Sequence, residues 1–304
     1  MKKCLLFIAL ALSACGGTGS FPPREAIRQV TPAGTATIAA HTAGPRPGSQ
    51  AASPALIVTP EAADRVDALL AHSDAGVAVV VAGGRSGEIL YATGPDEPVL
   101  AASLYKLAVL LEGERRIDAG TLRSTDLITV TAADQMESGS FSAAGSVLTV
   151  DEALERAIVL SDNAAALALI RRLTVPAIHA TLDHEQIYLR FTADGAVTTA
   201  RAIATFFGEL VRGSLVSREA SVRMLARLSR QRVVDRLPAA LPAGAVIAHK
   251  TGNLGFATHD AGILSGPGGA PIVLVVLTWD CPEQDGIDLI KAIALLVYEG
   301  LART

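Results

Sequence analysis

The 304-residue sequence is poor in cysteine, aromatic residues and charge, and each shortage excludes a class of protein. Its three cysteines, at positions 4, 15 and 281, do not stand beside histidines at zinc-site spacing, and His-Glu-x-x-His is absent. We therefore expect no metal site and no cofactor. A formal net charge of −4 lacks the basic excess typical of nucleic-acid binders, so no nucleic-acid partner is expected.

The only charge-free apolar run of membrane character lies at the N-terminus. Cys4 to Ala14 follow Lys2-Lys3 and are too few to span a bilayer, so residues 1–14 are interpreted as a signal peptide. Leu12-Ser13-Ala14-Cys15 resembles the bacterial lipobox, which predicts lipid attachment at Cys15 and an exported, membrane-anchored lipoprotein. The alternative is an ordinary secretory signal with a chance cysteine. With Cys4 removed and Cys15 lipidated, Cys281 has no partner for a disulfide.

Composition divides the remainder into a tether and a globular domain. Residues 15–59 are rich in Gly, Pro, Ser, Thr and Ala without hydrophobic periodicity, and are interpreted as a flexible tether. Residues 60–304 carry periodic patterns. Helices are expected over 61–72, 103–112, 151–173, 198–212, 217–230 and 285–301, and strands over 76–82, 88–92, 245–249, 262–265 and 272–279. This order predicts an α+β fold: an antiparallel sheet from both termini with an inserted all-helical lobe.

Three short motifs carry the candidate chemistry. Ser103-Leu104-Tyr105-Lys106 opens a predicted helix, Ser161-Asp162-Asn163 lies in the helical region, and Lys250-Thr251-Gly252 ends a predicted strand. A lysine three residues after a serine shares its helical face and can take its proton. It can do so only if its charged form is disfavoured, by burial and by a second ammonium.

Lysine usage supports this interpretation. Beyond Cys15 the chain has lysines only at 106, 250 and 291, although arginines are frequent. Two of these three lysines fall in the motifs, and Lys250 is the candidate for the second ammonium. Arginine could not replace either as a proton carrier, because its guanidinium effectively never deprotonates.

Together, the ordered motifs resemble those of the class A serine β-lactamases and the penicillin-binding peptidases. The resemblance covers about residues 60–304 and implies a β-lactamase/transpeptidase-like fold. It implies that Ser103 forms an acyl-enzyme, that Lys106 is its base and that Ser161 passes the proton to the leaving nitrogen. It also implies a substrate-binding set, in which the backbone amides of Ser103 and Asn253 form the oxyanion hole: Asn163, Lys250, Thr251, Gly252 and Asn253.

One family feature is missing. Class A β-lactamases carry Glu-x-x-Leu-Asn between the second and third motifs, and its glutamate activates the water that clears the acyl-enzyme. No such segment occurs here, and Glu185 is the only glutamate early in that interval. Glu185 is either a replacement base or, as its neighbours Leu182 and Ile187 favour, a solvated residue at a helix end. Without a base, a penicillin ester is expected to persist.

We expect a monomer, and the resemblance implies a small β-lactam or a D-alanyl peptide as its substrate. Three functions remain open. The first is β-lactam hydrolysis, the second is a D-alanyl-D-alanine carboxypeptidase or other peptidase or esterase of the same fold, and the third is a penicillin-binding lipoprotein without turnover. Two histidines flank the last motif. We expect His249 to point away from the cleft and His259 to lie at its rim, while Met136 and the 139–145 loop border it.

Overall fold

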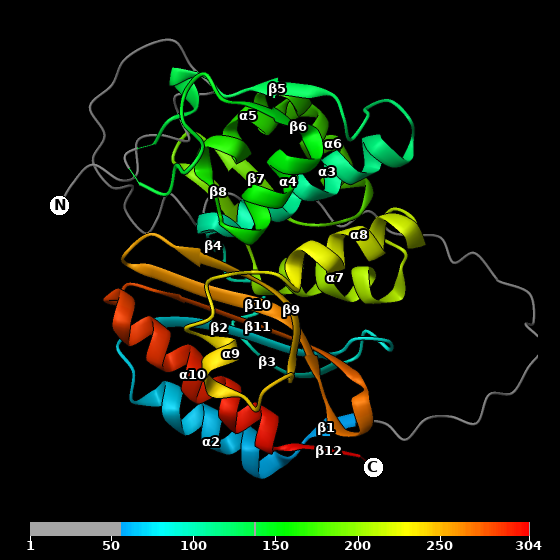
Figure 1. Ribbon diagram of the computed structural model, residues 1–304. Helices are drawn as coiled ribbons and strands as arrows, with labels where there is room; N and C mark the ends of the chain where they lie inside the picture. The colour runs from blue at the N-terminus through cyan, green and yellow to red at the C-terminus, as the bar shows by residue number, and fades with distance from the viewer. Residues whose placement is uncertain (1–55, 137, 304) are drawn as a thin grey trace, which may run out of the picture.

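The computed structural model describes residues 56–136 and 138–303, and its centre is a five-stranded antiparallel sheet in the order β3-β2-β11-β10-β9 (Figure 1). The strands are β2 (Gly76–Gly83), β3 (Ile89–Thr93), β9 (Val246–Asn253), β10 (Ala257–Ser265) and β11 (Pro271–Trp279). Strands from early in the chain therefore lie beside strands from its end. The predicted α+β fold, with one sheet assembled from both ends of the domain, is confirmed.

Helices cover both faces of the sheet. Side chains alternate along a strand, so Val79 and Val81 of β2 pack on one side while Ala78 and Val80 pack on the other. The first side is covered by α2 (Pro60–Ala71), α9 (Leu237–Ala240) and α10 (Glu283–Glu299), and α2 lies beside α10 in Figure 1. The second is covered by α7 (Ala200–Arg212) and by the lobe inserted between β3 and β9.

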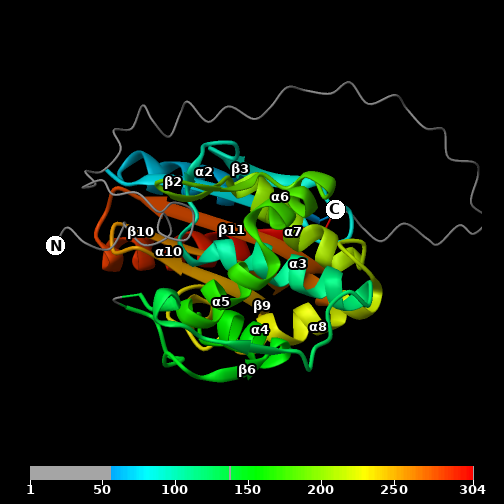
Figure 2. The same cartoon turned by 90° about the horizontal axis from the view of Figure 1, so that it is seen from above.

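The inserted lobe is mainly helical. Its helices are α3 (Lys106–Asp118), α4 (Val150–Val159), α5 (Asn163–Leu173), α6 (Val175–His184) and, beside α7, α8 (Arg218–Leu228). Seen from above, α3 crosses the sheet with α4 and α5 on one side and α6 on the other (Figure 2). The lobe also carries short strands that the sequence analysis did not predict: β4 (Val99–Leu100), β5 (Leu127–Thr129), β6 (Val147–Thr149), β7 (Leu189–Thr192) and β8 (Gly195–Thr198).

The helix expected over 151–173 is broken into α4 and α5. The apolar periodicity continues through both, but the carboxylate of Asp162 accepts the backbone N–H groups of Ala164 and Ala165 and caps α5. Ser161 has a left-handed φ of 58°, which few residues other than glycine adopt. The motif at 161–163 therefore sits at a corner between two helices.

The folded unit begins before the predicted boundary. Leu56–Val58 form β1, which pairs antiparallel with β12 (Leu301–Arg303), so the end of the span interpreted as a tether belongs to the domain. The predicted signal peptide and Cys15 lie outside the described residues. Among the residues that are described, none of the helices alone has the length and apolar character to cross a membrane, and α5 and α6 meet that test only as a pair bent by 84°.

Candidate active site

Ser103 lies at the junction between β4 and α3. Residues 102–105 form a single 3-10 turn, and Ala102, with a φ of 46°, turns the chain sharply just before the serine. Lys106 is the first residue of α3 and is fully buried, while Ser103 is half-buried. The three-residue spacing brings the Nζ of Lys106 to 2.8 Å from the Oγ of Ser103. The predicted pairing of the first motif is therefore present.

Four oxygens surround the Nζ of Lys106, from Ser103, Asn163 and both the backbone and the hydroxyl of Ser161. The Nζ lies 2.6 Å from the Oδ1 of Asn163 and 2.8 Å from the backbone oxygen of Ser161, both of which can only accept hydrogen bonds. A neutral amine has two N–H donors for these oxygens and one lone pair, which is left for the hydroxyl of Ser103. The arrangement can therefore take a proton from Oγ.

Burial and charge both act on the two motif lysines. Burial lowers the pKa of Lys106 well below its usual value, the positive charge of Lys250 lowers it further, and Asp162 opposes the shift. Burial also lowers the pKa of Lys250 to about 7. The Oγ of Ser161 lies 3.1 Å from the Nζ of Lys106 and 3.0 Å from that of Lys250. Ser161 therefore bridges the two amines and can pass a proton between them.

The corner that carries Ser161 is fastened by its neighbours. The carboxylate of Asp162 is fully buried and accepts the backbone N–H of Phe141 at 3.0 Å and the hydroxyl of Ser142 at 2.5 Å. Asn163 donates from Nδ2 to the backbone oxygen of Ser138 at 2.9 Å. Asp162 is thus a structural residue, and it ties the corner to the loop that borders the cleft.

The third motif lies inside β9, which runs further than predicted and packs edge-on against the turn that carries Ser103. A Cβ at Gly252 would lie 3.0 Å from the Cβ of Ala102, so any side chain there would push the strand and the turn apart. Asn253 follows, and its side chain accepts the backbone N–H of Gly255 at 2.7 Å and donates to Glu283. The strand end is therefore held on both sides.

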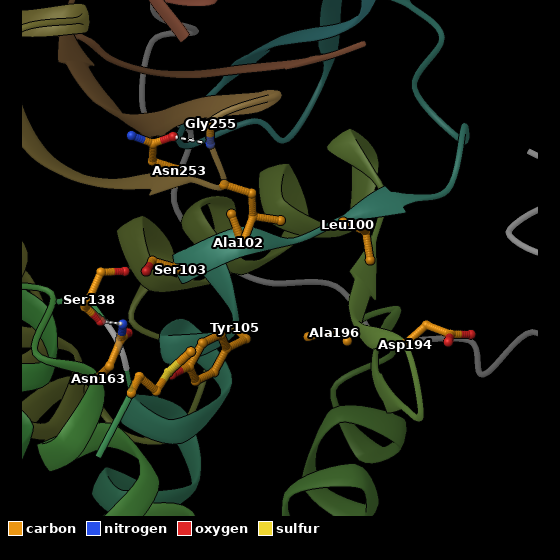
Figure 3. A pocket seen from close by; sticks show the side chains of 13 residues that line it. Leu100, Ala102, Ser103, Tyr105, Ser138, Asn163, Asp194, Ala196, Asn253 and Gly255 are labelled. Atoms are coloured by element: carbon orange, nitrogen blue, oxygen red, sulfur yellow. Dashed lines mark hydrogen bonds between the residues drawn. The ribbon is translucent and has the colours of Figure 1, made fainter. Parts of the chain in front are cut away.

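A cavity of about 280 Å³ opens in front of Ser103, lined among others by Tyr105, Met136, Asn163 and Asn253 (Figure 3). Met136 borders it as expected. Asp194 is the only charged residue among its described lining residues. It is exposed on the turn between β7 and β8, and Figure 3 shows its side chain directed away from Ser103. No other carboxylate belongs to the described residues that line the cavity.

The structure decides between the two interpretations of Glu185 and corrects the expectation for His259. Glu185 caps the C-terminus of α6 and contacts His184, outside the cavity, so it is the helix-end residue and not a base at this site. His259 does not lie at the rim: it is fully buried, accepts the N–H of Thr278 at Nδ1 and donates from Nε2 to Leu100. Burial lowers the pKa of His259 to about 4, so its ring is neutral.

Arg236 is the residue near the site that sequence reasoning missed. Its guanidinium is 2 % exposed, 3.5 Å from Asp235 and 3.9 Å from Glu283, and its Nε has no hydrogen-bond partner among the described residues. Its positive charge lowers the pKa of Lys250 further. Nothing in the local sequence marks this arginine among many others. The described residues also contain no group of three or more His, Cys, Asp or Glu that could hold a metal ion.

A family model described as the beta-lactamase enzyme family matches residues 61–301. A beta-lactamase of Streptomyces albus G is 34% identical over 164 residues, which are 47% of this chain and 52% of that protein. One from Streptomyces fradiae is 34% identical over 147 residues, 43% of this chain and 48% of that protein. The chain thus matches about half the length of these relatives.

Solved structures share the fold over a longer span. The structure of PBP-A has a TM-score of 0.74 at 24% identity and covers 79% of this chain and 95% of its own. An ancestral class A beta-lactamase has a TM-score of 0.71 at 26% identity and covers 78% of this chain and 99% of its own. The arrangement of sheet and lobe is therefore common to all three proteins.

Proposed function

The chain belongs to the beta-lactamase enzyme family, and from this membership we propose that it opens β-lactams by forming an acyl-enzyme on Ser103. The observation that carries the proposal is the 2.8 Å contact between the hydroxyl of Ser103 and the amine of Lys106, with Ser161 bridging to Lys250. A nucleophile and its base within hydrogen-bond reach are the minimum for such a step.

In the proposed acylation, one proton is passed from Ser103 through Lys106 and Ser161 to the leaving nitrogen. Lys106 takes the proton of Oγ as Oγ attacks the lactam carbonyl, and the backbone amides of Ser103 and Asn253 stabilise the oxyanion. The C–N bond then breaks. The leaving nitrogen receives a proton from Ser161, which regains one from Lys106, so the amine returns to its neutral form. Asn163 positions the acyl side chain, while Lys250 and Thr251 bind the substrate carboxylate, with Gly252 leaving room for the strand.

We expect the second half of the cycle to be slow. Hydrolysis of the ester needs a base for the attacking water, and the described cavity lining offers only the exposed Asp194, turned away from Ser103. Between the second and third motifs, the chain that joins α6 to α7 forms the β7–β8 hairpin. The penicilloyl ester should therefore outlast the acylation step.

The absence of a described carboxylate base directed at Ser103 also favours a second candidate, a peptidase that acts on acyl-D-alanyl peptides. A D-alanyl substrate has the scissile amide and the carboxylate that a penicillin presents, and its leaving group departs freely instead of staying tethered beside the ester. Release of free D-alanine from diacetyl-L-lysyl-D-alanyl-D-alanine would favour this candidate. Labelling by penicillin without turnover of either substrate would favour the penicillin-binding lipoprotein.

A fluorescent penicillin and a chromogenic cephalosporin test the proposal together. The penicillin should label the wild-type protein covalently and leave Ser103→Ala unlabelled, with equal circular dichroism spectra as the folding control. Equal labelling of the two proteins would refute the assignment of the nucleophile. Rapid steady-state hydrolysis of the cephalosporin would refute slow deacylation and leave acylation standing.

We also propose that the chain is exported and anchored through a lipid on Cys15, as the lipobox-like segment suggests. Labelled palmitate should enter the wild-type protein in cells and should not enter Cys15→Ser. Equal incorporation into both would contradict the anchor and leave the enzymatic proposal untouched.

A further inference from the structure

A buried polar pair lies on the face of β9 opposite to Lys250. The Nδ1 of His249 is 3.0 Å from the Oδ1 of Asp260, and the two side chains are 5 % and 0 % exposed. His249 precedes Lys250, so the alternation of the strand directs its side chain away from Ser103. Neither member lines the cavity, and the function proposed above uses neither.

The local backbone is built to accommodate this pair. Gly262 of β10 stands opposite His249 in the sheet, and a Cβ there would lie 2.6 Å from the Cβ of His249. The backbone N–H of Leu237 donates to the Oδ2 of Asp260 at 3.1 Å. Because a carboxylate can only accept, Nδ1 of His249 carries the proton and donates it to Asp260. The negative charge of Asp260 is therefore held in place by two donors.

Burying a carboxylate costs free energy unless hydrogen-bond donors and a positive charge compensate it, so the positive charges near Asp260 matter. Lys250 stands opposite Ala261 in the sheet, one residue along β10 from Asp260. Its Nζ donates to the Oγ of Ser161 at 3.0 Å and the backbone oxygen of Thr251 at 2.8 Å. Within the described part of the chain, no carboxylate is in ion-pair contact with that ammonium. The charge of Asp260 is the one that favours protonated Lys250, and the charge of Arg236 disfavours it.

The other charged groups around the pair leave this balance in place. Lys106 lies across Ser161 and adds a second amine on the cavity side. Glu283 of α10 faces Arg236 at 3.9 Å, on the same side as Asp260, and also accepts from Asn253. For Lys250 the two opposing charges are those of Asp260 and Arg236, whereas the buried carboxylate of Asp162 acts on Lys106. His249 is the only side-chain hydrogen-bond partner of Asp260 among the described residues.

We propose that His249 and Asp260 are positioning residues that keep Lys250 in its charged form, and so determine how strongly the site prefers substrates that carry a carboxylate. The inference rests on the proposed function, in which Lys250 binds that carboxylate. The pair acts through Lys250 and does not contact the substrate.

The test compares benzylpenicillin with its methyl ester, which has the same ring and side chain and no carboxylate. In Asp260→Asn the amide oxygen can still accept from Leu237, but the charge is gone. With the pKa of Lys250 at about 7, a further fall of about one unit would reduce the charged fraction about tenfold at about pH 8 and about twofold at about pH 6. The acylation efficiency for benzylpenicillin should fall accordingly, while that for the ester stays unchanged.

Variants of His249 provide an independent measurement that does not depend on how Asp260→Asn folds. His249→Gln keeps a side-chain N–H donor for Asp260 and should retain the wild-type preference for acid over ester. His249→Phe removes the donor, so the preference for benzylpenicillin over its ester should become smaller, and the reduction should be largest at the highest pH tested. Glu114→Gln is the matched control, because Glu114 is an equally buried, ion-paired carboxylate remote from Lys250. It should leave the acid-to-ester ratio unchanged.

The outcomes separate the inference from the proposed function. If the wild-type protein is not acylated by benzylpenicillin, both fail. If the wild-type protein is acylated and Asp260→Asn changes the acylation efficiency for benzylpenicillin and for its methyl ester by the same factor, or changes neither, the role of the pair is overturned. Ser103 then remains the nucleophile. An equal effect of His249→Gln and His249→Phe would likewise overturn it.

Discussion

Replacement of Asp162 should destabilise the protein strongly, although the residue makes no contact with substrate in the proposed mechanism. Its buried carboxylate accepts from Phe141, Ser142 and Ala164, and so joins the loop before α4 to the first turn of α5. Asp162→Ala removes a helix N-cap and leaves buried donors without partners. Asp162→Asn keeps an oxygen that can accept from the backbone N–H groups of Phe141, Ala164 and Ala165, and loses only the acceptor for the Ser142 hydroxyl.

The magnitude follows from these contacts. Loss of an N-cap costs about 1 kcal/mol, and each hydrogen bond to a charged group contributes about 1.5 to 3 kcal/mol. Allowing for partial relaxation of the loop, Asp162→Ala should lower the free energy of unfolding by about 4 kcal/mol, and Asp162→Asn by about 1 to 2 kcal/mol. For a domain of this size, these values correspond to falls in Tm of roughly 12 °C and roughly 3 to 6 °C.

Thermal and urea unfolding of the two variants would measure the effect. Asp288→Asn is the control, because Asp288 is exposed on α10 and, among the described residues, pairs only with Lys291 and Gln284 of that helix, so the Tm of this variant should match that of the wild type. A Tm of Asp162→Ala within about 3 °C of the wild type would refute the reasoning. It would mean that the corner at 160–163 holds its shape without the carboxylate.

Three further outcomes are expected. Gly252→Ala should reduce acylation by at least about tenfold at nearly unchanged Tm, since the new Cβ pushes β9 away from Ala102; unchanged labelling kinetics would argue against the close approach. Lys106→Arg replaces a neutral amine by a guanidinium that stays protonated and cannot accept the proton of Ser103, so acylation should fall by about a thousandfold or more in stopped-flow measurements, and a loss below about tenfold would contradict its role as base. Because the folded-state pKa of Lys250, about 7, lies below the usual 10.5, the unfolded chain binds more protons between these values, and the stability of the wild type should rise with pH across that window. Lys250→Met should flatten this rise in urea midpoints, with Lys106 leaving a smaller slope, whereas an identical slope in both proteins would count against the lowered pKa.

The sequence predicted correctly those features that depend on residues close together along the chain. The spacing of Ser103 and Lys106 specifies a contact within one helical turn, and the apolar periodicity located most helices and the strands of the sheet. Periodicity alone could not reveal the break between α4 and α5, because it is continuous there, whereas the chain turns at Ser161 and α5 starts anew with Asp162 as its N-cap.

What the sequence could not provide depends on contacts between distant segments. Arg236 stands out only when the fold buries it beside β9, and His259 was misplaced because strand alternation alone does not tell which face is enclosed. The β7–β8 hairpin was missed for a similar reason. Its strands are four residues each, and they become strands by pairing with one another and with β4.

The pairing of β1 with β12 brings the two ends of the folded unit together, since Leu56 and Arg303 are partners in the antiparallel register. Their Cα atoms are therefore only about 5 Å apart, and a short peptide could join them. New ends could be opened at Gly120, in the exposed turn after α3, where a Cβ would meet nothing within 4 Å. Such a circular permutant should keep the site intact, because the order of the motifs along the chain would change while their positions in the folded structure would not.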